Sequence, residues 1–195
     1  MITVIEIGCA NTASVLFALE RLGAEACLSS DPLEIAAASK VVLPGVGAAG
    51  FAMSRIRELG LYDAIRALKV PLLGVCLGQQ LLFEGSEEGD VACLGLIPGR
   101  VTKMTATPDM VVPHMGWNQL EVIKADPLTA GVKDGDFAYF VHSFVCPVND
   151  YTLATSAYGQ PFAAMVRKDN VFGCQFHPER SSATGAQILK NFVDL

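Results

Sequence analysis

Charged residues are scarce in this chain of 195 residues. Asp, Glu, Lys and Arg make up 17% of it, against about 25% in an average globular domain. A chain this poor in charge favours a protein partner that covers part of its surface, although its 24 alanines also raise the apolar content without forming a patch. The net charge is −6, which argues against nucleic acid as that partner.

Long apolar runs are also missing. No apolar run approaches the ~20 residues of a membrane span, and no basic region followed by a long apolar stretch opens the chain. We therefore expect neither a membrane span nor a signal peptide. The hydrophobic content of 51% is enough for one substantial core, so we expect a single domain over residues 1–195.

The cysteines lack the spacing of a metal site or a disulfide framework. No Cys-x-x-Cys pair occurs, so we expect no metal, and nothing in the sequence indicates a cofactor. Scattered free thiols fit a reducing cytoplasm, which is where we expect the protein. The six are Cys9, Cys27, Cys76, Cys93, Cys146 and Cys174.

Short apolar runs alternate with amphipathic segments in the first half of the chain. This pattern predicts an α/β fold with a mostly parallel central sheet and helices on both faces. Asn11 or Thr12 can cap the first helix, and Asp31-Pro32 can start the second. The predicted strands are 2–7, 25–28, 41–43 and 71–75, and the predicted helices are 12–22, a short one from 32, 49–58, 61–68 and 77–83.

The pattern changes near residue 94. From there to residue 175, short strands and turns with Pro and Gly predict a β-rich C-terminal extension of the same domain. A strand over 171–176 ends this region. A last helix is predicted over 181–193, with Ile188, Leu189 and Phe192 facing the core.

Cys76 lies where a predicted buried strand meets a helix, between Gly74 and Gly78. A sharp strand-to-helix turn strains its central residue and requires small neighbours. Such a turn sets the sulfur at a helix N-terminus, where backbone N–H groups and the helix dipole favour the thiolate. The N–H of Leu77 is then placed to stabilise an oxyanion. A lone buried cysteine is more often a small core residue, so Cys76 needs a base beside it to be a catalyst.

A second segment, about a hundred residues later, supplies that base. Pro178 biases His177 toward extended geometry, and residues two apart on an extended chain face the same way. His177 and Glu179 can therefore line up, with the imidazole taking the thiol proton and the carboxylate orienting the ring. Together with Cys76 they indicate acyl transfer through a Cys-His-Glu triad.

The Gly-x-Cys-x-Gly turn at 74–78 and the His-Pro-Glu at 177–179 resemble those of the class I glutamine amidotransferases. Three further segments are similar to the glutaminase subunit of imidazole glycerol phosphate synthase. They are Leu-Pro-Gly-Val-Gly at 43–47, Pro-His-Met-Gly-Trp-Asn at 113–118 and Tyr-Phe-Val-His-Ser-Phe at 139–144. The resemblance covers essentially the whole chain.

The resemblance implies that Cys76 attacks the side-chain amide of L-glutamine and that ammonia passes to a cyclase subunit with a (β/α)8 barrel fold, in a heterodimer for histidine biosynthesis. It implies a second oxyanion donor from Val46 or Gly47. The implied substrate-binding residues are Gln80, Glu88, His142, Ser143 and Phe144. The implied partner interface comprises Asn11, Met115, Trp117, Asn118, Tyr139 and Arg180.

Three positions depart from the family pattern. The first turn reads Gly-Cys-Ala-Asn at 8–11 in place of Gly-x-Gly-Asn, Phe144 replaces a tyrosine, and Arg180 replaces a lysine. Three alternatives also stay open. One is another class I glutaminase, for pyridoxal phosphate, purine or anthranilate synthesis. The others are a peptidase or γ-glutamyl hydrolase, and a non-catalytic interaction protein with a relict triad.

Overall fold

The computed structural model describes residues 1–8, 11–108 and 110–195. Cys9 therefore lies outside the described residues, as does part of the turn over 8–11. In the described chain, eight strands form the main sheet in the order β2-β1-β3-β4-β14-β13-β12-β9. Their bounds are β1 (Ile2–Ile5), β2 (Ala26–Ser29), β3 (Lys40–Gly45), β4 (Leu72–Cys76), β9 (Glu121–Val122), β12 (Thr152–Tyr158), β13 (Gln160–Lys168) and β14 (Val171–Cys174).

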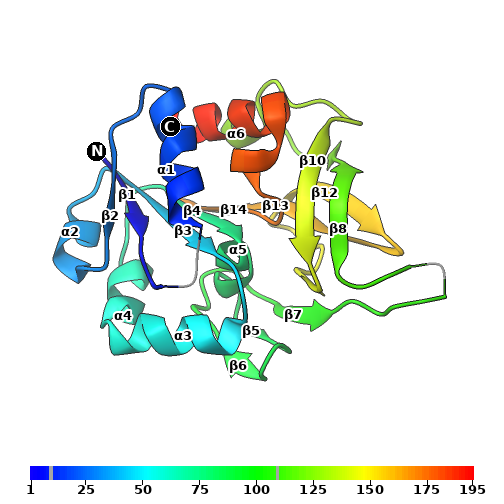
Figure 1. Cartoon of the computed structure of the whole chain (residues 1–195), viewed down its shortest axis with the longest axis horizontal. Coiled ribbons are helices and arrows are strands. Elements are labelled where there is room, and N and C mark those ends of the chain that lie inside the picture. Colours follow the sequence, from blue (N-terminus) through cyan, green and yellow to red (C-terminus); the bar gives the residue numbers. More distant parts are fainter. Residues whose placement is uncertain (9–10, 109) are drawn as a thin grey trace.

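The strands from β2 to β14 run parallel, and β13, β12 and β9 continue the sheet with antiparallel pairing. Helices cover both faces, as the alternating sequence pattern predicts (Figure 1). They are α1 (Thr12–Arg21), α2 (Pro32–Ala36), α3 (Ala49–Glu58), α4 (Leu61–Arg66), α5 (Leu77–Leu81) and α6 (Ser182–Asp194).

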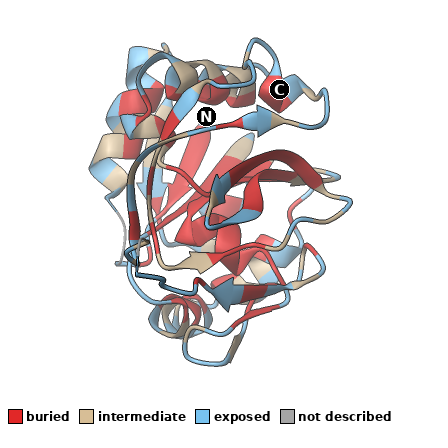
Figure 2. Ribbon diagram, turned by 90° about the vertical axis from the view of Figure 1, so that its right-hand side faces the viewer, coloured by how far each residue is buried: buried red, intermediate tan, exposed pale blue. Residues whose placement is uncertain are grey.

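Side chains of β3 show how the two faces divide. Val42 packs into one core with residues of α1 and α6, whereas Val41 and Leu43 pack into the other with residues of α2, α3, α4 and α5. Successive residues of a strand point to opposite faces, so a continuous apolar run buries both sides of a parallel sheet. The buried residues follow this central sheet and the inner sides of the helices (Figure 2).

Two small sheets make up the rest of the β-rich region. One pairs β8 (His114–Gln119) with β10 (Phe137–His142), and the other has the order β11-β7-β5-β6. The bounds of the latter are β5 (Gly85–Ser86), β6 (Val91–Ala92), β7 (Arg100–Lys103) and β11 (Phe144–Val145). The prediction of an extension beginning near residue 94 is therefore too late, and β12 to β14 belong to the main sheet.

The short helix α5 also differs from its prediction, because it ends at Leu81 and not at residue 83. The N–H groups of Leu82 and Phe83 reach the carbonyls of Gln79 and Gln80, three residues back. This tighter 3-10 pattern closes the helix end. The last turn brings the chain toward β5, where the loop carrying Glu88 begins.

No helix in the described part of the chain is long and apolar enough to cross a membrane. Across those same residues, no group of three or more His, Cys, Asp or Glu side chains is arranged to hold a metal ion.

Candidate active site

The turn at Cys76 has the strained geometry that the sequence predicts. Cys76 has φ 55° and ψ −112°, a conformation that side-chain-bearing residues rarely adopt. A Cβ added to Gly78 would lie 1.8 Å from the carbonyl oxygen of Leu43, and one added to Gly74 would lie 2.6 Å from that of Gly78. Both glycines are therefore required for the close packing of α5 against β3 and β4.

The sheet register brings three chain segments to one edge. Gly45 at the end of β3 lies beside Cys76 at the end of β4, and Cys174 at the end of β14 lies beside Val75. The turn containing Val46 and Gly47 and the segment leading to His177 therefore leave the sheet next to the cysteine. Ligand sites of open α/β sheets form at this carboxyl edge of the strands.

His177 and Glu179 pair as predicted, but by a different backbone route. His177 is extended, whereas Pro178–Arg180 forms a short 3-10 helix, η2. The expectation that both side chains share one face of an extended strand is thus wrong. The tight turn nonetheless brings Nδ1 of His177 to 2.9 Å from Oε1 of Glu179, because i and i+2 side chains can also meet across a turn.

The electrostatics of this pair favour a charged imidazole. Burial alone lowers the pKa of His177, but the side chains of Cys76 and Glu179 that face the ring outweigh it and raise the pKa to about 10. The side chain of Glu179 is 2% exposed, and its Oε2 has no hydrogen-bond partner among the described residues. An imidazolium next to this buried carboxylate offsets the cost of keeping it ionised.

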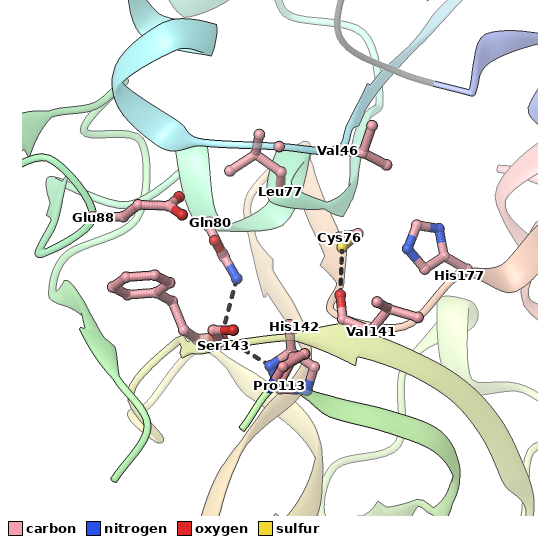
Figure 3. A pocket seen from close by; sticks show the side chains of 12 residues that line it. Val46, Cys76, Leu77, Gln80, Glu88, Pro113, Val141, His142, Ser143 and His177 are labelled. Atoms are coloured by element: carbon pink, nitrogen blue, oxygen red, sulfur yellow. Dashed lines mark hydrogen bonds between the residues drawn. The ribbon is translucent and has the colours of Figure 1, made fainter. Parts of the chain in front are cut away.

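A cavity of about 240 Å³ opens over the cysteine. Cys76 and His177 lie at one end of it and Glu88 and Gln80 at the other (Figure 3). Ten of the predicted site residues line it, with Pro113 and Val141 in addition. The ten are Val46, Gly47, Cys76, Leu77, Gln80, Glu88, His142, Ser143, Phe144 and His177.

Each polar group at the far end is anchored by the fold. Oε2 of Glu88 accepts a hydrogen bond of 2.7 Å from the N–H of Ala49 in the first turn of α3, where the helix dipole favours a carboxylate. Nε2 of Gln80 donates to the carbonyl of Phe144 at 3.0 Å. The cavity thus combines a thiol, an imidazole, an amide and a carboxylate around a space that suits one amino acid.

The comparisons with known proteins agree with this geometry. The model of the family described as glutamine amidotransferase class-I matches residues 3–195. The chain belongs to the class-I glutamine amidotransferase family. This amidotransferase is 50% identical over 194 residues to imidazole glycerol phosphate synthase subunit HisH of Xylella fastidiosa (strain Temecula1 / ATCC 700964), covering 100% of the chain and 97% of that protein.

Further relatives carry the same name. The HisH subunit of Xanthomonas euvesicatoria pv. vesicatoria (strain 85-10) is 52% identical over 194 residues, with 100% of the chain and 97% of the relative covered. That of Vibrio cholerae serotype O1 is 47% identical over 200 residues, with 100% and 98% covered.

Solved structures are similar to the amidotransferase in fold. The crystal structure of a putative GMP synthase subunit from Thermoplasma acidophilum matches with a TM-score of 0.75 and 20% identity, over 99% of this chain and 92% of that one. PurLQS from Thermotoga maritima matches with a TM-score of 0.72 and 20% identity, over 99% and 97%.

Three of the six predicted interface residues of the amidotransferase, Met115, Trp117 and Tyr139, lie on the outer face of the β8–β10 sheet. Trp117 is paired with Tyr139 across the two strands, their ring centroids are 5.8 Å apart, and Trp117 is 52% exposed. Met115, two residues before Trp117, lies on the same face of β8 and is exposed. Arg180 and Asn11 are exposed as well, the former in η2 and the latter as the N-cap of α1.

Asn118 is placed differently from the rest of that set. It alternates with Trp117 along β8, so its side chain faces the opposite side of the strand. Its Nδ2 donates to the carbonyl of Ala157 at 2.9 Å and lies 3.4 Å from Nε2 of His114. The amide is therefore engaged inside the molecule, which makes a structural role the simpler account of this residue.

His114 and His142 are buried and hydrogen-bonded to each other, and His142, which the resemblance implies to bind substrate, also lines the cavity. Nδ1 of His142 donates to the carbonyl of Phe144 at 2.8 Å, so Nε2 of its neutral ring accepts from Nδ1 of His114 at 3.0 Å. Burial lowers the pKa of each ring to about 4, which keeps both neutral. Cys174 is likewise a core residue, since it is fully buried, and this burial raises the pKa of its thiol well above the ordinary value.

Sequence reasoning missed Gln175. Its side chain is fully buried, and its Nε2 lies 3.9 Å from Sγ of Cys76. A polar residue inside the apolar run before His177 is unusual, but nothing in the local sequence indicates what its side chain contacts. Val141 was missed too, because its backbone carbonyl makes the contact, at 3.8 Å from the same sulfur.

Proposed function

We propose that this chain is the glutaminase subunit of an imidazole glycerol phosphate synthase. It hydrolyses L-glutamine to glutamate and ammonia, and a cyclase subunit with a (β/α)8 barrel fold uses the ammonia for histidine biosynthesis. The observation that carries this proposal is the strained Cys76 turn beside His177 at one end of a small cavity. Full-length relatives with about half their residues identical carry the HisH name, which supports the assignment to this synthase.

The geometry supports a two-step acyl transfer. The Cys76 thiolate attacks the carbonyl carbon of the glutamine side chain, and the oxygen becomes an oxyanion facing the N–H of Leu77. Leu77 is the first residue of α5, so its N–H has no partner within the helix. A second donor comes from the backbone at Val46 or Gly47. His177 gives its proton to the leaving nitrogen, and ammonia departs as the carbon–nitrogen bond breaks.

The second step consumes water. The cysteinyl thioester is hydrolysed when His177, now neutral, takes a proton from an attacking water molecule. The sulfur leaves as a thiolate and glutamate is released, which restores the imidazolium–thiolate pair. Glu179 stays at Nδ1 throughout and holds the ring. Glu88 and Gln80, at the other end of the cavity, bind the amino-acid part of the substrate together with the segment 142–144.

The outer face of the β8–β10 sheet is the surface that we assign to the cyclase. Tyr139 links it to the triad through its backbone. Its carbonyl accepts from the N–H of His177 at 2.9 Å, and its N–H donates to Oγ of Ser181 at 2.9 Å. A partner that shifts β10 would therefore move η2 and the base. A hundredfold activation by the partner needs about 2.7 kcal/mol of coupling.

Three alternative functions explain fewer of these structural features. Another class I glutaminase would lack a reason for the Gly-Trp-Asn segment of β8, which exposes Trp117. A peptidase or γ-glutamyl hydrolase would not need Glu88 fixed at the N-terminus of α3. A relict triad would not need to keep the strained conformation of Cys76, which costs of order 1–3 kcal/mol.

We also propose that residues 1–195 act as one glutamine amidotransferase domain in the cytoplasm. The family model spans 3–195, and α1 packs against α6, so the two ends of the chain share one core. Free thiols, including the buried Cys93 and Cys146, suit a reducing compartment.

Labelling with an electrophilic glutamine analogue tests the proposed function. We expect a diazo-ketone analogue of glutamine to modify Cys76, and we expect free L-glutamine to slow the reaction. Mass spectrometry of the digested chain identifies the modified peptide. Modification of other cysteines in place of Cys76, or a rate that glutamine does not change, contradicts the assignment.

A further inference from the structure

The side-chain amides behind Cys76 have orientations that the fold determines. The carbonyl oxygen of Phe144 can only accept hydrogen bonds, so the atom of Gln80 that lies 3.0 Å from it is the amide nitrogen. The same nitrogen lies 3.0 Å from Gln175, whose facing atom must then be the acceptor Oε1. The amide nitrogen of Gln175 therefore points the other way, toward Sγ of Cys76 at 3.9 Å.

The carbonyl of Phe144, where this series of hydrogen bonds begins, is itself held in place. The Phe144 carbonyl also accepts from Nδ1 of His142, whose Nε2 is paired with Nδ1 of His114. Gln80 and Gln175 are both buried, and the backbone N–H of Gln175 is held by the carbonyl of Ala164 at 2.9 Å. Rotation of either amide by 180° would place like groups against each other.

We propose that Gln175 is a catalytic residue that presents an amide N–H to the nucleophilic sulfur and so favours its thiolate. This role rests on the proposed function only in taking Cys76 as the nucleophile. Gln175 directly follows β14, and its side chain adds a donor to the N–H groups at the N-terminus of α5. It also gives Gln80 a second anchor, which aligns the substrate cavity with the sulfur.

The sulfur faces the His177 ring, and its two other contacts differ between its protonation states. In the thiol, S–H donates to the carbonyl of Val141 at 3.8 Å, and the N–H of Gln175 approaches the sulfur. Loss of the proton removes the first bond and leaves a carbonyl dipole facing a negative charge. The N–H of Gln175 remains and becomes a charge-assisted donor, which is stronger than a neutral one. Gln175 therefore acts on the form of the sulfur that attacks glutamine.

Gln79 provides a matched control within the same core. Its side chain is also fully buried, but its Nε2 donates to the carbonyl of Ala163 at 3.0 Å, away from Cys76. Gln79→Met and Gln175→Met both replace a buried amide by a thioether of similar length. Comparison of the two separates the loss of a buried hydrogen bond from the loss of the donor to the sulfur.

The test is the pH dependence of Cys76 alkylation by iodoacetamide in the full chain, followed by mass spectrometry of the Cys76 peptide. We expect Gln175→Met to shift the pH–rate profile upward by about one unit, a roughly tenfold slower reaction at pH 7. Gln79→Met should follow the wild type. Gln175→Leu provides a second donor-free variant if the methionine variant unfolds, which thermal unfolding reveals.

The possible outcomes test the role of Gln175 separately from the assignment of Cys76 as the nucleophile. Superimposable profiles for the wild type and a folded Gln175 variant overturn the role of Gln175 while leaving Cys76 as the nucleophile. Equal shifts in the Gln79 and Gln175 variants also overturn it, because they indicate a general loss of packing. If wild-type Cys76 reacts at neutral pH no faster than the partly exposed Cys27, the proposed function fails together with this inference.

Discussion

At the scale of single residues, the proposed mechanism has His177 transfer the proton and Glu179 hold the ring that carries it. We expect His177→Asn to lower the turnover number for glutamine by about 10³-fold or more, and Glu179→Gln by a smaller factor of about 10². In the Glu179→Gln variant, the side chain at position 179 can still accept a hydrogen bond from Nδ1 of His177 but carries no charge. Steady-state glutamate release measures both, with thermal unfolding as the control for folding. A Glu179→Gln variant as inactive as the histidine variant would mean that the carboxylate does more than orient and charge the ring.

Single residues are also where sequence reasoning succeeds best and fails most clearly. Cys76 and His177 could be predicted, because each stands in a short motif whose chemistry depends on neighbours in the chain. Gln175 could not, because its role depends on Gln80, 95 positions away, and on a backbone carbonyl. No local pattern encodes which atom a buried amide presents to a distant sulfur.

At the scale of elements, the turn from β4 to α5 depends on Gly78. A Cβ there would lie 1.8 Å from the carbonyl of Leu43, and neither backbone segment can move without displacing a central strand. We expect Gly78→Ala to lower the free energy of unfolding by about 3 kcal/mol and to abolish activity. Gly50→Ala in α3 is the matched control, since nothing lies within 4 Å of its added Cβ. It should stabilise the chain by about 0.5 kcal/mol, as alanine favours helices. Urea unfolding measures both, and an unchanged Gly78→Ala variant would contradict the packing argument.

The β8–β10 sheet carries a second prediction at this scale, on pH. Folding lowers the pKa of His114 and of His142 to about 4 from 6.5, so between these values the unfolded chain binds more protons than the folded one. The free energy of unfolding should therefore fall as the pH drops from 6.5 to 4, by about 1.4 kcal/mol per pH unit for each fully titrating ring. Above pH 6.5 the two rings contribute no slope.

His114→Gln isolates this contribution from that of the carboxylates. It removes one titrating ring. The slope of the free energy of unfolding against pH should therefore be shallower than in the wild type by about the contribution of one ring. Urea unfolding at several pH values between 6.5 and 4 gives both slopes. Equal slopes in the variant and the wild type would show that folding does not change the pKa of His114.

Elements were predicted better where periodicity decides than where a turn decides. The helix over 49–58 was predicted with its observed bounds, because its apolar spacing and flanking glycines are local signals. The segment after His177 was predicted as extended, but Pro178–Arg180 coils into η2. The hydrogen bond from Oγ of Ser181 to the carbonyl of His177 and that from the N–H of Tyr139 to the same Oγ fix this turn, and the latter is a tertiary contact.

At the scale of the whole molecule, the central claim is that glutamine hydrolysis belongs to this chain and ammonia use to another. The alternation of strands and helices predicted the parallel sheet, whereas the placement of β12 to β14 on that sheet depends on long-range pairing that no local pattern encodes. The proposed partner surface around Trp117 comes from the resemblance, and Trp117 is exposed there. We expect Trp117→Ala to weaken association with the cyclase, as measured by co-elution in size-exclusion chromatography, while the fold persists.

The most direct test of that claim is the Cys76→Ala variant in complex with a cyclase subunit. Synthesis of imidazole glycerol phosphate is measured twice, once with L-glutamine and once with an ammonium salt as the nitrogen source. We predict that the glutamine-dependent reaction is lost and that the ammonia-dependent reaction continues at the wild-type rate, because the variant removes only the nucleophile. Undiminished glutamate release by the folded variant would contradict the account.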